Sequence, residues 1–82
     1  GTPDRKTLAE IVGRRLEKLR KSQGFSTAAE FADFIGIRPH ALWRYENGQV
    51  LPGADVLRRI TEKCGVSVDS LVGHEPQAKA NP

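Results

Sequence analysis

The sequence predicts an all-α fold, a compact domain of five short helices. Three observations support this class. Apolar residues recur at steps of three and four, no segment alternates apolar and polar residues with a period of two, and capping or helix-ending residues separate five segments. With 82 residues the chain has room for one small domain, which we place at residues 1–73, followed by a polar tail or linker at residues 74–82.

The first predicted helix has an apolar stripe with helical spacing. Its members are Leu8, Val12, Leu16 and Leu19. Two starts fit the sequence, either Thr2-Pro3 as the cap and first helical residue, or Thr7 with Glu10 as a capping box. Gly24 suits the left-handed position after the helix, and Phe25 is then expected to fold back on Leu19.

The second and third predicted helices are short. Thr27 and Glu30 form a capping box that begins the second helix, and Gly36 ends it. The apolar face of the second helix consists of Phe31, Ala32 and Ile35. Arg38-Pro39 begins the third helix, because proline keeps the preceding residue out of the helical region and presets its own φ. This helix is expected to run to about Asn47. Its inward-facing residues are Leu42 and Tyr45.

Two further helices complete the domain. Gly53 is expected to cap the fourth helix and Gly65 to close it, and its core residues are Val56, Leu57 and Ile60. Ser67 caps a fifth helix that Gly73 ends, and its apolar residues are Val68, Leu71 and Val72. Cys64, in the last turn of the fourth helix, is expected to be a small buried apolar side chain.

Residues 28–47 have the spacing of a helix-turn-helix, with Ala32 where the two helices cross and Gly36 at the turn. Five short motifs follow one another along the chain: Gly24-Phe25-Ser26, Glu30-Phe31-Ala32, Ile35-Gly36-Ile37, Tyr45-Glu46-Asn47-Gly48 and Gly65-Val66-Ser67-Val68-Asp69-Ser70-Leu71. In the order and spacing of these motifs, the chain resembles the lambda-repressor-like helix-turn-helix family of bacterial and phage transcription regulators over roughly residues 7–73. The resemblance implies sequence-specific binding to double-stranded DNA by a homodimer on a palindromic operator, with repression as the expected outcome.

The resemblance also implies roles for individual residues. The third helix would lie in the major groove, with Arg44 as the base reader, because a guanidinium can bond guanine O6 and N7 together. The start of the second helix would face phosphates. Arg20 and Glu46 match a pair that is often a structural salt bridge. The expected DNA-binding residues are Ser26, Thr27, Ala28, Arg38, Pro39, His40, Trp43, Arg44 and Asn47.

Two aromatic residues leave an alternative open. Trp43 allows three interpretations: a buried residue, an apolar contact with DNA such as a thymine methyl, or part of a protein interface. Phe34 is expected in an interface or in half-buried packing. Together they motivate a protein-interaction adaptor or an antitoxin-type partner-binding domain on the same fold.

Charge and composition limit the function classes. The net charge is +3, and residues 1–22 hold seven basic against three acidic residues, or +4, which permits nucleic-acid binding. Part of this excess is expected to be a solvated helix face, at Arg14, Arg15, Lys18 and Lys21. The same is expected of Arg58 and Arg59, with a phosphate contact as the alternative.

Other classes are disfavoured. One cysteine excludes a disulfide framework, and no apolar run is long enough for a membrane span, so a cytoplasmic location is expected. His40 and His74 have no second metal ligand nearby, and no nucleophile has a positioned base, so we expect no metal, no cofactor and no enzyme activity. The absence of methionine suggests a piece of a longer protein, with a further domain beyond residue 82 as one alternative.

Overall fold

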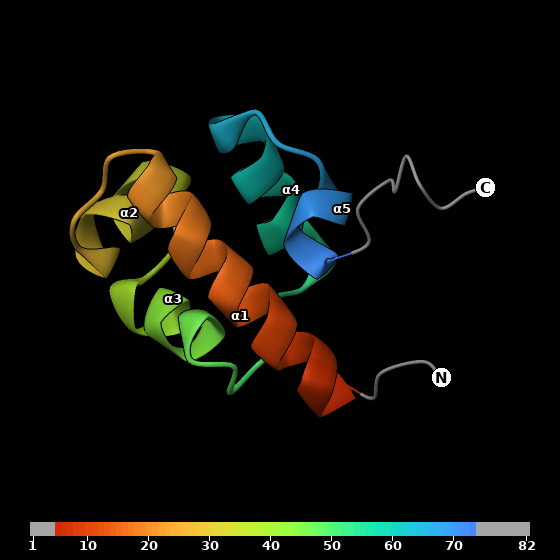
Figure 1. Cartoon of the computed structure of the whole chain (residues 1–82). Coiled ribbons are helices and arrows are strands. Elements are labelled where there is room, and N and C mark those ends of the chain that lie inside the picture. Colours follow the sequence, from red (N-terminus) through yellow and green to blue (C-terminus); the bar gives the residue numbers. More distant parts are fainter. Residues whose placement is uncertain (1–4, 74–82) are drawn as a thin grey trace.

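The protein is all-helical over residues 5–73, the part of the chain that this computed structural model describes (Figure 1). Its helices are α1 (Arg5–Ser22), α2 (Ala28–Ile35), α3 (Pro39–Glu46), α4 (Ala54–Cys64) and α5 (Val68–Val72). The fold class and the five predicted helical segments are therefore confirmed. The tail expected at residues 74–82 and the alternative helix start at Thr2-Pro3 lie outside the described residues.

One predicted start of α1 is wrong. Thr7 lies inside a helix that already includes Arg5, so Thr7 and Glu10 do not form the capping box of its first turn. Threonine is tolerated within a helix, and a Thr-x-x-Glu pattern therefore occurs at interior positions as well as at starts.

The predicted left-handed glycine at the end of α1 is confirmed. Gly24 has a φ of 90°, and its amide donates to the carbonyl of Lys21 at 3.1 Å. The amide of Phe25 donates to the carbonyl of Arg20, also at 3.1 Å. These two bonds satisfy carbonyls at the end of the helix and turn the chain toward α2. The ring of Phe25 then lies 5.3 Å from that of Phe31 and 5.2 Å from that of Phe34, centroid to centroid.

The predicted capping residues set the bounds of the other helices. The hydroxyl of Thr27 accepts the amide of Glu30 at 3.2 Å, and Ser67 accepts the amide of Ser70 at the same distance. Arg38 is extended, with ψ 143°, and makes no side-chain cap, so α3 begins at its proline alone. Gly53 precedes α4, as expected.

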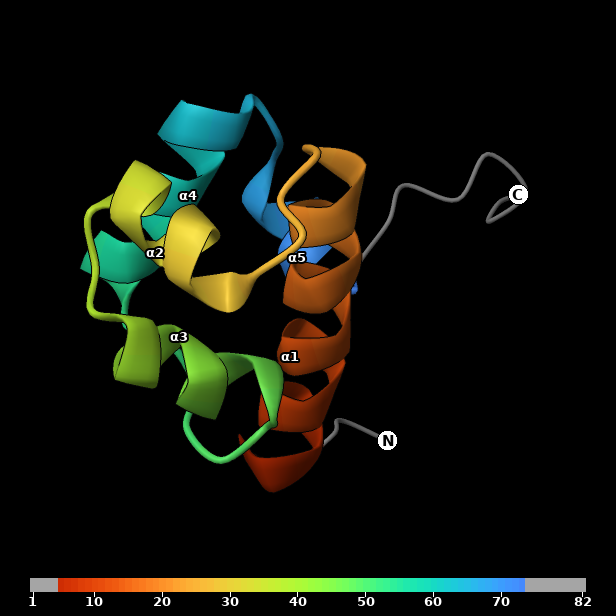
Figure 2. The same cartoon turned by 90° about the vertical axis from the view of Figure 1, so that its left-hand side faces the viewer.

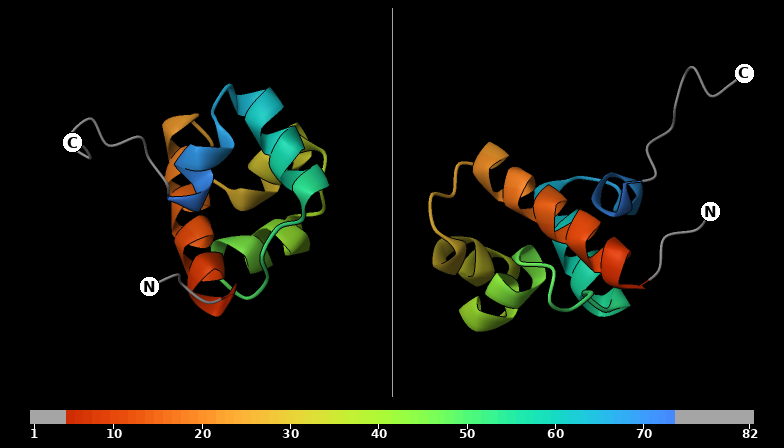
Figure 3. Two further views of the ribbon diagram at one scale, coloured as in Figure 1. Left: turned by 90° about the vertical axis from the view of Figure 1, so that its right-hand side faces the viewer. Right: turned by 60° about the horizontal axis from the view of Figure 1, so that its bottom comes forward.

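A single core lies between the helices. α1 packs against α3 and α5, α2 packs against α3 and α4, and α4 contacts α5 (Figure 3). The buried residues of this core are Val12, Leu16, Phe31, Ala32, Ile35, Leu42, Ile60 and Leu71. The predicted apolar face of α2 is thus confirmed, and Tyr45, Val56, Leu57 and Cys64 pack against the core while partly buried.

The end of α3 lies directly against Gly13 of α1. A Cβ atom at Gly13 would be 2.5 Å from the carbonyl oxygen of Tyr45 and 2.7 Å from that of Glu46. Side chains do not approach backbone this closely, so only glycine permits the observed spacing between the two helices. Gly13 therefore helps to set the position of α3.

Candidate nucleic-acid interface

The helices α2 and α3 form one surface of the molecule and face the viewer in Figure 2. The turn between them begins at Gly36, whose φ is 93°. Its amide and that of Ile37 both donate to the carbonyl of Ala32, at 2.8 and 2.9 Å. Arg59 of α4 donates from Nη1 to the carbonyl oxygen of Gly36 at 2.7 Å. Arg59 is exposed, as expected, and the structure adds that its guanidinium also holds the backbone of the turn.

A second arginine ties the ends of this surface together. Nε of Arg20 donates to Oε2 of Glu46 at 2.9 Å, and Nη1 donates to the carbonyls of Phe25 at 3.2 Å and Ser26 at 3.0 Å. The pair that the resemblance implied is therefore present. It connects the segment before α2 with the last residue of α3, so both ends of the surface are held to α1.

Four of the nine expected DNA-binding residues meet in one place. An open depression lies where the first residue of α2 approaches the first turns of α3. It is lined by Ala28, Pro39, His40 and Trp43. The rings of His40 and Trp43 stack, with centroids 5.8 Å apart and planes inclined by 9°. Trp43 is 47% exposed, so its interpretation as a buried residue is wrong.

The charged members of the set are exposed. Arg38 directly precedes this depression in the chain and Arg44 directly follows Trp43, and both side chains are exposed. Among the residues that the structure describes, neither arginine forms an ion pair. Their charge is thus not neutralised within the described domain, which suits contact with an anionic partner.

The remaining expected residues lie at helix ends. Ser26 and Thr27 are exposed before α2, where the first amides of the helix have no intrahelical acceptor. The hydroxyl of Thr27 is engaged in capping Glu30. Asn47 is exposed after α3, and its Nδ2 donates to the carbonyl of Trp43 at 2.8 Å, which leaves the amide oxygen and one hydrogen for other contacts.

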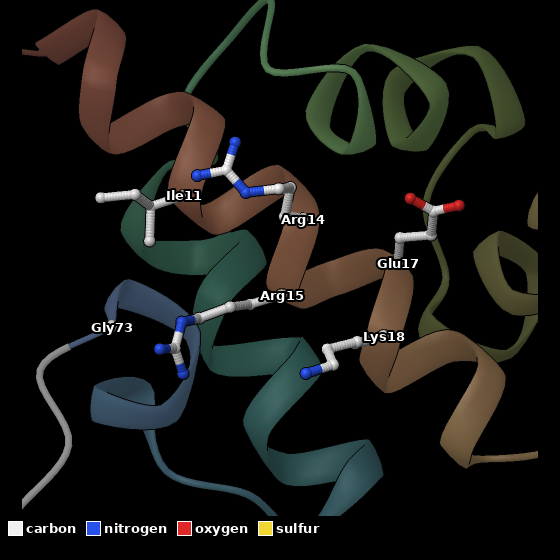
Figure 4. A pocket seen from close by; sticks show the side chains of 6 residues that line it. All are labelled: Ile11, Arg14, Arg15, Glu17, Lys18 and Gly73. Atoms are coloured by element: carbon white, nitrogen blue, oxygen red, sulfur yellow. The ribbon is translucent and has the colours of Figure 1, made fainter.

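Basic residues also gather away from this surface, on α1 beside α5 (Figure 4). The depression there is lined by Ile11, Arg14, Arg15, Glu17, Lys18 and Gly73. Arg15 extends toward Gly73 and donates from Nη1 to the carbonyl of Ser70 at 3.1 Å. The expectation that Arg15 belongs to a purely solvated face is therefore wrong, because this side chain holds α5 to α1. Lys21 pairs with Glu17 at 3.2 Å on an exposed part of the same helix.

Other kinds of site find no support in the described part of the chain. Residues 5–73 contain no group of three or more His, Cys, Asp or Glu side chains placed to hold a metal ion. No helix in this range is long and apolar enough to cross a membrane. Cys64 is partly buried, and desolvation raises the pKa of its thiol above the usual value.

The chain is similar in sequence to known helix-turn-helix proteins. A family described as "Helix-turn-helix domain" matches residues 11–72. The chain is 38% identical over 62 residues to YonR, a prophage-derived HTH-type transcriptional regulator of Bacillus subtilis. The matched residues cover 76% of this chain and 56% of YonR. It is 36% identical over 67 residues to the HTH-type transcriptional regulator YazB of the same organism, covering 82% of this chain and 96% of YazB.

A third relative has a different kind of name. Antitoxin PezA of Streptococcus pneumoniae is 34% identical over 65 residues, covering 79% of this chain and 40% of PezA. The chain thus spans little more than half of YonR and less than half of PezA. No solved structure gives a significant match.

Proposed function

This chain belongs to the helix-turn-helix domain family, and from that premise we propose that it is a transcriptional regulator that binds double-stranded DNA sequence-specifically, with α3 in the major groove. The observation that supports this most is the surface of α2 and α3. It is exposed, and hydrogen bonds from Arg20 and Arg59 hold its turn and its ends. Its two arginines, Arg38 and Arg44, have no acidic partner within the described residues. Unpaired guanidinium groups on a preformed surface are suited to contact the phosphates of DNA.

In this proposal the domain makes two kinds of contact with DNA, one with phosphates and one with base edges. The exposed start of α2, with Ser26 and Thr27, and the guanidinium of Arg38 contact phosphates and fix the orientation. Arg44 and His40 on α3 read base edges, with Arg44 directed at guanine. Asn47 adds a phosphate contact at the end of α3. Phosphate contacts supply affinity that falls with salt, and the base contacts supply specificity.

The proposal extends to the assembly. A homodimer would place two copies of α3 in successive major grooves, about 34 Å apart, and would therefore select a palindromic operator. Binding at an operator would repress transcription in the cytoplasm. The homodimer and the palindromic operator rest on the family resemblance, and the relatives named as transcriptional regulators support the regulatory role.

Selection from a randomised duplex pool, followed by fluorescence anisotropy on the selected sequence over a salt series, tests the function. We expect a palindromic motif and an affinity that falls steeply with salt, with a log–log slope of about −0.9 for each phosphate neutralised. The same selection with the chain fused to a dimer-forming coiled coil controls for weak self-association. If neither form enriches a motif, the proposal is wrong.

A second candidate function is binding to a protein partner. Phe34 is 38% exposed on α2, its ring packs 5.2 Å from Phe25, and Nζ of Lys63 lies 5.6 Å from its centroid. This aromatic and basic spot suits a partner with apolar and acidic groups. The relative named as an antitoxin also supports it. Failure of both DNA selections, with the domain shown to be folded by circular dichroism, would favour this second function.

A further inference from the structure

We propose that the depression lined by Ala28, Pro39, His40 and Trp43 reads a thymine in the operator by taking up its 5-methyl group. This inference rests on the proposed function and adds a base preference to it. The lining comes from both helices of the helix-turn-helix, so the site exists only in the folded arrangement of α2 and α3.

The chemistry of the lining is mainly apolar. Ala28 contributes a methyl group and Pro39 a pyrrolidine ring, while His40 and Trp43 contribute stacked ring surfaces. No acidic or basic side chain other than the imidazole lines the depression. The polar atoms of guanine, adenine or cytosine placed over this lining would find only the imidazole of His40 and the indole N–H of Trp43 as partners, and most of their contact would be with apolar surface. An apolar group is therefore the best occupant.

The major groove offers one such group. Of the four bases only thymine presents an apolar substituent there, the methyl on C5, and apolar side chains contact it in DNA complexes. Because α3 provides three of the four lining residues, its insertion in the groove brings the depression against the base edges. A methyl group seated there would leave water and contact the indole of Trp43.

The two rings of the lining are already in contact in the free protein. Proline has a restricted backbone, and the stacking of His40 on Trp43 limits the rotation of both rings. The backbone carbonyl of Trp43 also accepts Nδ2 of Asn47 at 2.8 Å, which holds the backbone of the last turn of α3. Binding would therefore order few side chains, and little of the contact energy would be lost to entropy.

The charges around the depression favour DNA as the occupant. Arg38 and Arg44 adjoin Pro39 and Trp43 in the chain, and neither is paired with an acidic residue in residues 5–73. The helix that provides most of the apolar lining is thus preceded by one unpaired arginine and carries another, and such charges can contact the phosphates that flank a base edge.

Deoxyuridine substitution isolates the methyl group, because uracil differs from thymine only at C5. In the selected duplex each thymine is replaced by deoxyuridine in turn, and affinity is measured by anisotropy at one salt concentration. For the unmodified protein we expect one thymine of each half-site to show about a fourfold loss, the affinity that burial of one methyl group contributes. The remaining thymines should show no change.

Protein variants then assign that loss to the depression. Trp43→Ala is expected to bind the thymine and deoxyuridine duplexes equally. Arg44→Ala is the matched control: it should bind both duplexes more weakly and keep the fourfold difference, because Trp43 is intact. Trp43 is half-exposed and outside the core, and circular dichroism will confirm that its variant is folded.

Three results would overturn the inference: a selected site without thymine, equal affinity for thymine and deoxyuridine at every position, or full discrimination retained by Trp43→Ala. Each of them requires that a DNA site has been selected, so each leaves the proposed function standing. Failure to select any site would instead overturn the proposed function itself.

Discussion

Arg20 and Glu46 form an ion pair that joins the end of α1 to the end of α3, with 2.9 Å between Nε and Oε2. The two side chains are only 10% and 9% exposed. The same guanidinium donates to the carbonyls of Phe25 and Ser26, so three separate segments meet at one side chain. The relative placement of α2 and α3 therefore depends on Arg20.

Loss of Arg20 should destabilise the domain strongly. We expect Arg20→Met to lower the free energy of unfolding by about 3 kcal/mol, because Glu46 would keep a buried charge without a partner. Urea denaturation followed by circular dichroism measures this. Adding Glu46→Leu should recover much of the loss, since both charges are then replaced by apolar groups.

The exposed pair between Glu17 and Lys21 supplies the control for that experiment. Its side chains are 46% and 64% exposed, and Glu17→Ala should cost less than about 1 kcal/mol. Equal losses for Arg20→Met and Glu17→Ala would show that the pair at Glu46 has no special structural role.

Gly13→Ala is expected to destabilise the domain, although helix propensity alone predicts the opposite. Alanine is favoured over glycine within a helix by about 1 kcal/mol. Its Cβ, however, would lie 2.5 Å from the carbonyl oxygen of Tyr45, and separating α1 from α3 should cost about 1–3 kcal/mol. A midpoint of urea denaturation above that of the parent would contradict the close approach.

Gly13 also shows what could not be predicted from the sequence. The caps at Thr27 and the turn at Gly36 depend on neighbours within a few residues, so local patterns identify them. The contact of Gly13 is with residues 45 and 46, and nothing within α1 signals it. Likewise Arg15 and Arg59 bond to carbonyls 55 and 23 residues away, and both had the appearance of solvated surface charges.

The candidate interface was predictable to a similar extent. Helical spacing and the family resemblance placed Pro39, His40, Trp43 and Arg44 on the third helix, and the structure shows all of them exposed. His40 and Trp43 are three residues apart on α3, so helical spacing brings their rings together, whereas their meeting with Ala28 depends on how α2 crosses α3. The sequence placed the crossing at Ala32 and the turn at Gly36, but it did not show that Ala28 would lie against the rings of His40 and Trp43. Whether these residues contact DNA stays a prediction.

Cys64 gives a prediction about pH. Burial raises the pKa of its thiol above 9.0, so the unfolded chain loses this proton first as pH rises. The contribution of the thiol to stability is therefore full below about pH 9 and is lost as pH rises through the folded pKa. In urea denaturation above pH 9 we expect the parent to lose more stability than Cys64→Ala. Identical pH profiles for the two proteins would contradict this.

Trp43 provides an intrinsic probe of the interface, because it is the single tryptophan of the chain. At 47% exposure its fluorescence should be quenched readily by acrylamide in the free protein. In the complex with the selected duplex, the indole should be shielded and quenching should fall. Unchanged quenching under saturating DNA would show that DNA does not cover this part of α3.

A pair of charge-matched variants separates base reading from general attraction. Arg44→Ala and Lys18→Ala each remove one positive charge from an exposed position, but Arg44 lies on α3 and Lys18 on α1 beside α5. We expect Arg44→Ala to cost about 1–3 kcal/mol on the selected site and to relax the preference at one base pair. Lys18→Ala should leave base preference intact and change affinity only slightly, because charges farther apart than about 10 Å are largely screened at 0.1 M salt. Arg38→Ala removes a charge that we propose contacts a phosphate. It should weaken binding to all sequences alike and reduce the salt slope by about one. Equal losses for Arg44→Ala and Lys18→Ala, with base preference unchanged in both, would mean that net charge and not α3 determines binding.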